Sequence, residues 1–178
     1  MATKAASHLV LTAVGPDRPG LVRAISSVVL GASASVEDSR MAILGGEFAL
    51  IMLVSGAEAA VSRVEREALA LETELGLKFL FKRTSAESRR EFLPYVIKVT
   101  GLDRPGIVHA VTDLLAKRAV NVASFESRVT FAPDTGTPLF VLEADLQAPS
   151  EVTLAELERE LARLCQDENL DFSLEAKG

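Results

Sequence analysis

The tetrapeptide Asp17-Arg18-Pro19-Gly20 recurs 86 residues later as Asp103-Arg104-Pro105-Gly106. The match continues past the glycine, because apolar side chains follow each copy at the same positions. They are Leu21, Val22, Ile25, Val28 and Val29 in the first copy, and Ile107, Val108, Val111, Leu114 and Leu115 in the second. Self-similarity at a fixed period indicates a repeated structural unit. Two copies in 178 residues therefore predict two small domains.

A second match lies further along the chain at a different spacing. Glu37-Asp38-Ser39-Arg40 is similar to Phe125-Glu126-Ser127-Arg128, with the two serines 88 residues apart. The change from 86 to 88 predicts two extra residues in the second copy. We place them at the end of its first helix, where a connection tolerates an insertion.

The spacing of apolar residues predicts the same order of strands and helices in each copy. The short, partly β-branched run at 9–14 is typical of a buried strand, and 8–15 aligns with 94–101. The spacing 21, 22, 25, 28, 29 places apolar side chains on one face of a helix. Gly45-Gly46 favours a tight hairpin turn. The remaining predicted elements are strands at 35–44, 47–54, 77–82, 122–131, 139–146 and 170–174 and helices at 57–75 and 152–166.

The order β-α-β-β-α-β in each copy predicts an α+β protein of two ferredoxin-like domains. Each domain should have a four-stranded antiparallel sheet with two helices on one face. The predicted boundaries are domain 1 at 1–84, a polar linker at 85–92 and domain 2 at 93–178. Because one sheet face and the sheet edges lack cover, we expect the domains to pack on each other and the chain to form a homodimer.

The ends of the helices carry local signals. Gly76 is expected to close the helix at 57–75, since glycine readily adopts the left-handed conformation that ends helices. Thr153 and Glu156 have the spacing of a capping box, and Ser150 competes with Thr153 as the cap. The apolar spacing of Leu157, Leu161 and Cys165 indicates that the single cysteine is a core residue.

Composition excludes several classes of protein. A net charge of −6 disfavours direct binding of nucleic acid, and an aromatic content of 5% leaves few platforms on which bases could stack. One cysteine excludes a cysteine-cluster metal site and fits a reducing compartment. The apolar run at 9–14 is too short to span a membrane. We therefore expect a soluble, cytoplasmic protein without metal, cofactor or membrane partner, and the absence of any catalytic constellation with usable spacing predicts a non-enzyme.

The repeated tetrapeptide lies between the first strand and the first helix of each copy, where the unpaired N–H groups of a helix start can bind an anion. Asp17 could cap the helix or accept a hydrogen bond from a ligand ammonium, and Arg18 could reach a carboxylate. Together these groups suit a small zwitterion such as an α-amino acid. Arg23 and His109, on the first helical turn, could also lie near a ligand carboxylate, but the favoured interpretation of both is a solvated helix residue. The alternative is that the tetrapeptide serves only as a turn and helix cap.

Two such units, each with Gly-X-Asp-Arg-Pro-Gly after its first strand, resemble tandem ACT domains, small regulatory modules that mostly bind amino acids. The stretch from Val36-Glu37-Asp38-Ser39-Arg40 through Gly45-Gly46-Glu47 to Ser55-Gly56 resembles the glycine cleavage system transcriptional repressor family more narrowly. That resemblance implies a regulator without a DNA-binding domain that contacts a DNA-binding transcription factor and responds to glycine or a similar small amino acid.

The resemblance also implies the binding residues. The ligand would lie near the strand–helix loop and against the start of the second strand of a neighbouring domain. In this sequence those residues are Asp17, Arg18, Pro19, Gly20 and Ser35, and Asp103, Arg104, Pro105, Gly106 and Asn121. Two other functions remain open at this point: a structural or assembly module that binds no ligand, and a dissociable regulatory subunit of an amino-acid metabolic enzyme.

Overall fold

The structure, a computed structural model, describes residues 6–85 and 92–177. The chain divides into two compact units, which we call unit 1 (Met1–Ser88) and unit 2 (Arg89–Gly178). Residues 86–91 of the predicted linker lie outside the described residues.

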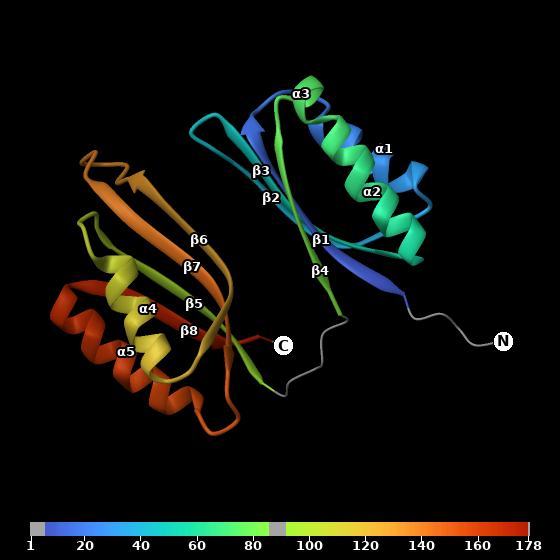
Figure 1. The fold of residues 1–178 in the computed structure, drawn as a ribbon. Helices are drawn as coiled ribbons and strands as arrows, with labels where there is room; N and C mark the ends of the chain where they lie inside the picture. Colours follow the sequence, from blue (N-terminus) through green and yellow to red (C-terminus); the bar gives the residue numbers. More distant parts are fainter. Residues whose placement is uncertain (1–5, 86–91, 178) are drawn as a thin grey trace. The chain divides into compact units, whose positions relative to one another are not determined.

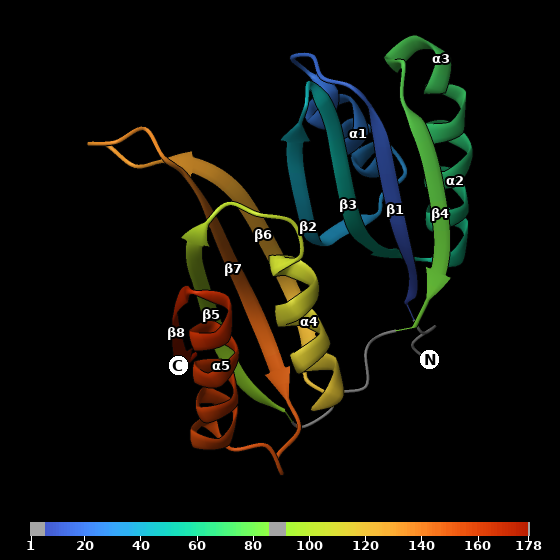
Figure 2. The same cartoon turned by 90° about the vertical axis from the view of Figure 1, so that its left-hand side faces the viewer.

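Unit 1 is a four-stranded antiparallel sheet with its helices on one face (Figures 1 and 2). The strand order is β2-β3-β1-β4, so the first strand lies inside the sheet and β2 and β4 form its edges. The elements are β1 (Ser7–Pro16), α1 (Leu21–Gly31), β2 (Ser35–Leu44), β3 (Glu47–Gly56), α2 (Glu58–Ala70), α3 (Glu72–Leu75) and β4 (Lys78–Thr84).

Unit 2 repeats this architecture, with strand order β6-β7-β5-β8 and helices α4 and α5 on one face of the sheet (Figure 2). Its elements are β5 (Leu93–Leu102), α4 (Ile107–Lys117), β6 (Asn121–Phe131), β7 (Pro138–Ala148), α5 (Leu154–Glu168) and β8 (Leu170–Ala176). The predicted α+β class and the two ferredoxin-like folds are confirmed.

Each core lies between the sheet and its helices. Along β1, Leu9, Leu11 and Ala13 are fully buried, and the side chains between them point to the face that no helix of unit 1 covers. Leu21, Ile25, Val28 and Val29 of α1 complete this core, as the helical spacing predicted. In unit 2 the cluster includes Tyr95, Ile97, Val99, Leu157, Leu161 and Cys165.

The prediction of two extra residues after the first helix of the second copy is wrong. Helices α1 and α4 both have 11 residues, and the strands that follow begin at Ser35 and Asn121, still 86 residues apart. The second copy is instead longer in the hairpin, by more than the predicted two residues: Gly45-Gly46 in unit 1 is replaced by residues 132–137 in unit 2. Asp38 therefore corresponds to Ser124, and the similar tripeptides Asp38-Ser39-Arg40 and Glu126-Ser127-Arg128 are shifted by two residues along their strands. A shift of two leaves the side chains on the same face of the sheet.

The ends of the helices follow most of the local predictions. Thr153 is the N-cap of α5 and forms the complete capping box with Glu156, so Ser150 does not cap this helix. Gly76 ends the helical region in the left-handed conformation, with φ 69°, and Asn169 does the same in unit 2. The predicted helix at 57–75 is divided at Leu71 into α2 and α3. The Glu72 carboxylate accepts a hydrogen bond from the backbone N–H of Phe79 at 2.9 Å, and this bond is the main cause that lowers the pKa of Glu72.

Ala119 is a strained residue at the end of α4. Its φ is 54°, in the left-handed region that disfavours residues with a Cβ. Ala119→Gly should therefore raise the free energy of unfolding by about 1 kcal/mol. Ala116→Gly, inside the same helix, is the matched control and should lower it by about 0.5–1 kcal/mol. Urea denaturation measures both effects, and a loss of stability in Ala119→Gly would contradict the assignment of strain.

Among the described residues, no helix is long and apolar enough to cross a membrane.

Candidate functional site

The two tetrapeptide loops have the same geometry. Each connects a central strand to the first helix of its unit and is tied to the nearby hairpin by a backbone hydrogen bond. The N–H of Asp17 donates to the carbonyl of Gly46 at 3.0 Å, and the N–H of Asp103 donates to the carbonyl of Pro138 at 3.2 Å. The loops are therefore held at the end of the sheet where the hairpin turns.

The glycine of each loop is the N-cap of the helix. Gly20 and Gly106 have φ of 97° and 100°, and apart from their chain neighbours no residue comes within 4 Å of the place where a Cβ would stand. The carbonyls of both glycines accept the first helical hydrogen bonds, from Ala24 and Ala110, at 2.9 Å. The space before each helix start is thus open, and the N–H groups of the first turn face it without an acceptor from their own helix.

Asp17 and Asp103 do not cap these helices. Neither helix has a side-chain hydrogen bond at its N-cap, so the capping role that the sequence allowed for Asp17 is not formed. Both residues are exposed, and within the described ranges no hydrogen-bond or ion-pair partner of either carboxylate occurs. The two acidic side chains therefore stand beside the helix starts with their oxygens accessible.

The arginines of the tetrapeptides bind the far ends of the second helical segments. Arg18 Nη2 donates to the carbonyl of Glu74 at 2.9 Å, and Arg104 Nη2 donates to the carbonyl of Glu168 at the same distance. Arg104 also pairs with the Glu168 carboxylate. These contacts satisfy carbonyls that a helix end leaves unpaired. Each arginine thus connects its loop to the end of α3 or α5, a structural role that sequence reasoning missed.

Ser35 and Asn121 lie at the opposite end of their sheets from the loops. Ser35 pairs with Ser55 near the start of β1, whereas Pro16, at the end of β1, pairs with Glu47. Asn121 occupies the same position in unit 2, and its Nδ2 donates to Gln147 Oε1 at 2.8 Å. Ten-residue strands separate the two ends by roughly 30 Å. Within one unit, no small ligand can contact both the loop and the start of the second strand.

Gly15 and Gly101, the first glycines of the two Gly-X-Asp-Arg-Pro-Gly motifs, also position the loops, a packing role that sequence reasoning did not assign to them. A Cβ on Gly15 would lie 2.5 Å from the carbonyl oxygen of Gly76, and one on Gly101 would lie 2.4 Å from a methyl group of Leu170. The absence of a side chain lets the strand pass close to the chain that leaves the second helical segment. The recurrence of glycine at this position in both copies was the signal available in the sequence.

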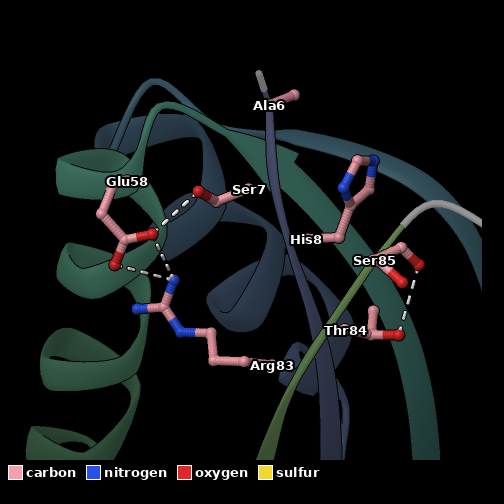
Figure 3. Close-up of a pocket in the computed structure, with 7 residues that line it drawn as sticks. All are labelled: Ala6, Ser7, His8, Glu58, Arg83, Thr84 and Ser85. Carbon is pink, nitrogen blue, oxygen red and sulfur yellow. Dashed lines mark hydrogen bonds and ion pairs between the residues drawn. The ribbon is translucent and has the colours of Figure 1, made fainter. Parts of the chain in front are cut away.

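A surface pocket lies at the other end of unit 1 and contains none of the predicted binding residues (Figure 3). Ser7 Oγ donates to Glu58 at 2.8 Å, and Arg83 pairs with Glu58 at 3.2 Å and with Glu65 at 2.8 Å. Figure 3 shows His8 on the other side of β1, where it faces Glu37 at 3.4 Å. The charges of the pocket are therefore paired within the protein.

Cys165 is buried in the core of unit 2, as the helical spacing predicted. Burial is the main cause that raises its pKa to about 11, and Asp171 adds to the effect. A thiol is a weaker nucleophile than a thiolate. Cys165 should therefore react slowly with a thiol reagent in the native protein, and completely once urea unfolds the chain. Rapid labelling of the native chain at neutral pH would contradict this placement.

The raised pKa of Cys165 also makes the free energy of unfolding depend on pH. Because the pKa is about 11 in the folded chain and 9.0 without burial, the neutral thiol favours folding below pH 9.0. This contribution should fall as the pH rises from 9.0 towards about 11, and Cys165→Ala should remove that part of the decline. Urea midpoints measured across this range for both proteins test the assignment, which equal declines would contradict.

The comparisons with known proteins agree with this architecture. ACT-domain family models match residues 7–82 and 95–162. The fold and the family matches together define a protein of two ACT domains in tandem.

Full-length relatives define the family more closely. The glycine cleavage system transcriptional repressor of Escherichia coli (strain K12) is 32% identical over 168 residues, which cover 94% of this chain and 88% of that protein. A crystal structure of a putative glycine cleavage system transcriptional repressor is 30% identical with a TM-score of 0.71, over 96% of this chain and 97% of that one. An unknown protein from Galdieria sulphuraria is 32% identical with a TM-score of 0.80, over 97% and 99% of the two chains. The chain belongs to the glycine cleavage system transcriptional repressor family, and the predicted resemblance is confirmed.

Membership of this family and the two ACT domains support a regulatory rather than an enzymatic role. Among the described residues, no group of three or more histidine, cysteine, aspartate or glutamate side chains is placed to hold a metal ion.

Proposed function

We propose that this protein is an amino-acid sensor that regulates transcription through a protein partner, and that its effector is glycine or a similarly small amino acid. The observation that carries the proposal is the pair of equivalent loops. Each offers an open helix start, a glycine that leaves room for a ligand, and an acidic side chain without a partner among the described residues.

The chemistry of each loop matches a zwitterion. The N–H groups of the first turn of α1 or α4 would donate hydrogen bonds to the ligand carboxylate, and the partial positive charge of a helix start would favour its negative charge. The carboxylate of Asp17 or Asp103 would accept a hydrogen bond from the ligand ammonium. Pro19 and Pro105 set the chain direction just before the glycine, and Arg18 and Arg104 hold the loops in place from the side.

The proposed ligand site uses the loop residues of a unit and not its second strand. Ser35 and Asn121 are too far from the loop of their own unit to share a small ligand with it. For Ser35 or Asn121 to contact the ligand, the ligand must therefore be held by a loop that does not belong to the same unit.

A protein partner fits the charge of the chain better than DNA does. The net charge is −6, so phosphates would be repelled on average. The relative from Escherichia coli is named a transcriptional repressor, and we propose that this chain acts on transcription by binding a DNA-binding transcription factor. The chain alone should not retard a promoter fragment in a gel, whereas with the partner present glycine should change the retardation.

Thermal unfolding against a panel of amino acids tests the sensor. A ligand at 100 times its Kd should add about 2.7 kcal/mol to the free energy of unfolding. Asp17→Asn and Asp103→Asn, made singly, show which loop binds, because each amide lacks the charge that faces the ammonium. Asp113→Asn on α4, where Asp113 pairs with Lys117, is the matched control and should keep the response. No stabilisation by any amino acid at millimolar concentration would refute the proposal.

A further inference from the structure

The helices of unit 1 leave one face of its sheet uncovered (Figure 2). Along β1, the side chains that alternate with the buried Leu9, Leu11 and Ala13 lie on this face, and their cross-strand neighbours share it. We call this surface the open face. The apolar side chains at its centre are Val10, Val14, Ala42, Ala49, Ile51, Leu53 and Leu80. Ile51 is 49% exposed and Leu80 is 70% exposed, so the open face presents apolar area to the outside of unit 1.

The equivalent face of unit 2 carries charges instead. Glu143 of β7 takes the place that Ile51 has in β3, and it pairs with Lys98 at 3.3 Å. Asp145 takes the place of Leu53. Charged side chains on a sheet surface are favourably hydrated, whereas a contiguous apolar face gains free energy when another surface covers it. The apolar character of the open face is therefore particular to unit 1.

One row of the open face runs from a cation at one edge of the sheet to an anion at the other. The cross-strand neighbours in this row are, in order, Lys82 of β4, Val10 of β1, Leu53 of β3 and Asp38 of β2. Within the described residues, the Lys82 ammonium has no hydrogen-bond or ion-pair partner. The Asp38 side chain pairs with Arg40 of its own strand but is still 60% exposed. Opposite charges thus flank an apolar centre.

A two-fold axis can make this row complementary to itself. When the axis lies between two stacked sheets and runs parallel to the strands, β4 of one copy lies over β2 of the other, and each residue keeps its height along the strands. Lys82 of each copy then faces Asp38 of the other, and Val10 faces Leu53. An axis perpendicular to the strands would set β4 over β4 and bring Lys78 and Lys82 of both copies together. Charge therefore favours the parallel axis.

The open face is also large enough for a specific interface. Strands β1, β2 and β3 have ten residues each and β4 has seven. At about 3.3 Å per residue and about 4.8 Å between strands, the sheet covers roughly 600 Å². Two stacked faces would bury about 1,200 Å², which reaches the range of specific protein interfaces. We propose that two copies of this chain dimerise by stacking the open faces of their units 1, with Lys82 of each copy paired with Asp38 of the other.

Charge reversal tests the proposed orientation. Lys82→Glu and Asp38→Lys, made singly, should each weaken dimerisation of the full chain by about tenfold or more at low ionic strength, because both symmetric ion pairs become repulsive. The double variant, in which the two charges are exchanged, should dimerise again. Lys78→Glu, on the same strand and face but opposite Ala42 of the other copy, is the matched control and should change the dissociation constant by less than about threefold. Sedimentation over a range of concentrations gives the dissociation constants, and circular dichroism checks that each variant is folded.

An exposed leucine gives a second test that does not depend on charge. Leu80 lies at the β4 edge of the open face, and the equivalent residue of unit 2 is Ser173. Leu80→Ser should weaken the dimer by about tenfold or more, since it removes a side chain from each copy that the other copy would cover. Leu30→Ser, at a residue of α1 that is 78% exposed, is the matched control and should leave the dimer unchanged.

Three results would overturn the proposal. The first is a wild-type chain that stays monomeric at every concentration tested. The second is a dimer that both Lys82→Glu and Leu80→Ser leave intact, because such a dimer forms through another surface. The third is an exchanged variant, Lys82→Glu/Asp38→Lys, that is folded but fails to dimerise.

Discussion

Gly15→Ala is expected to lower the free energy of unfolding of unit 1 by about 2–3 kcal/mol, since the added Cβ overpacks a closed site. The clash is with a backbone atom, because the new Cβ would lie 2.5 Å from the carbonyl oxygen of Gly76. No side-chain rotation can relieve it, so β1 or the start of β4 must move. Denaturation followed by far-ultraviolet circular dichroism measures the loss.

Two matched glycines make the Gly15 prediction specific. Gly101 occupies the equivalent place in unit 2, but its Cβ would meet a Leu170 methyl group, which can move, so Gly101→Ala should cost less. Gly31, the last residue of α1, has open space around it, and Gly31→Ala should be neutral or stabilise by about 0.5 kcal/mol. Equal stability of the Gly15 variant and wild type would contradict the close approach of the two chain segments.

Leu161→Ala should destabilise unit 2 by about 3 kcal/mol, because it removes a large side chain from a closed core. Leu161 is fully buried in the cluster that contains Tyr95. The chain has one tyrosine and no tryptophan, so tyrosine fluorescence reports on unit 2 directly. Leu102→Ala, at a side chain that is 60% exposed, is the control and should change stability by less than about 0.5 kcal/mol. Similar losses in both variants would contradict the assignment of the core.

The sequence predicts the fold where the interactions are local or periodic. The alternation along β1 and the helical spacing from Leu21 to Val29 identify the buried faces, because burial imposes those periods. The Gly45-Gly46 turn and the Thr153–Glu156 capping box are also local, since each depends only on residues close in the chain. These features could be predicted without knowledge of the tertiary structure.

Features that depend on distant contacts could not be predicted. The hydrogen bond from Arg18 to Glu74 joins residues 56 positions apart, and that from Arg104 to Glu168 joins residues 64 apart. The place of the added residues in unit 2 was also predicted wrongly. The similar tripeptides of β2 and β6 are shifted by two residues along their strands, and such a shift leaves each side chain on the same face, so the sequence alone gives no sign of it. The equal lengths of α1 and α4 and the strand pairings of the two hairpins reveal it.

The candidate site was partly predictable for the same reason. The sequence placed Asp17 and Asp103 beside helix starts, and the structure adds that neither carboxylate caps its helix. Their positions relative to Ser35 and Asn121 depend on the direction of β2 and β6 in the sheets. The loop residues are thus the part of the site that each unit can provide by itself.

Calorimetric titration of glycine into the full chain tests the proposed sensor most directly. The account predicts saturable binding to the wild-type protein, and loss of that binding in the double variant Asp17→Asn/Asp103→Asn, with the Asp113→Asn control unchanged. The absence of saturable binding of glycine and of every other small amino acid would contradict it, as would binding that the double variant retains in full.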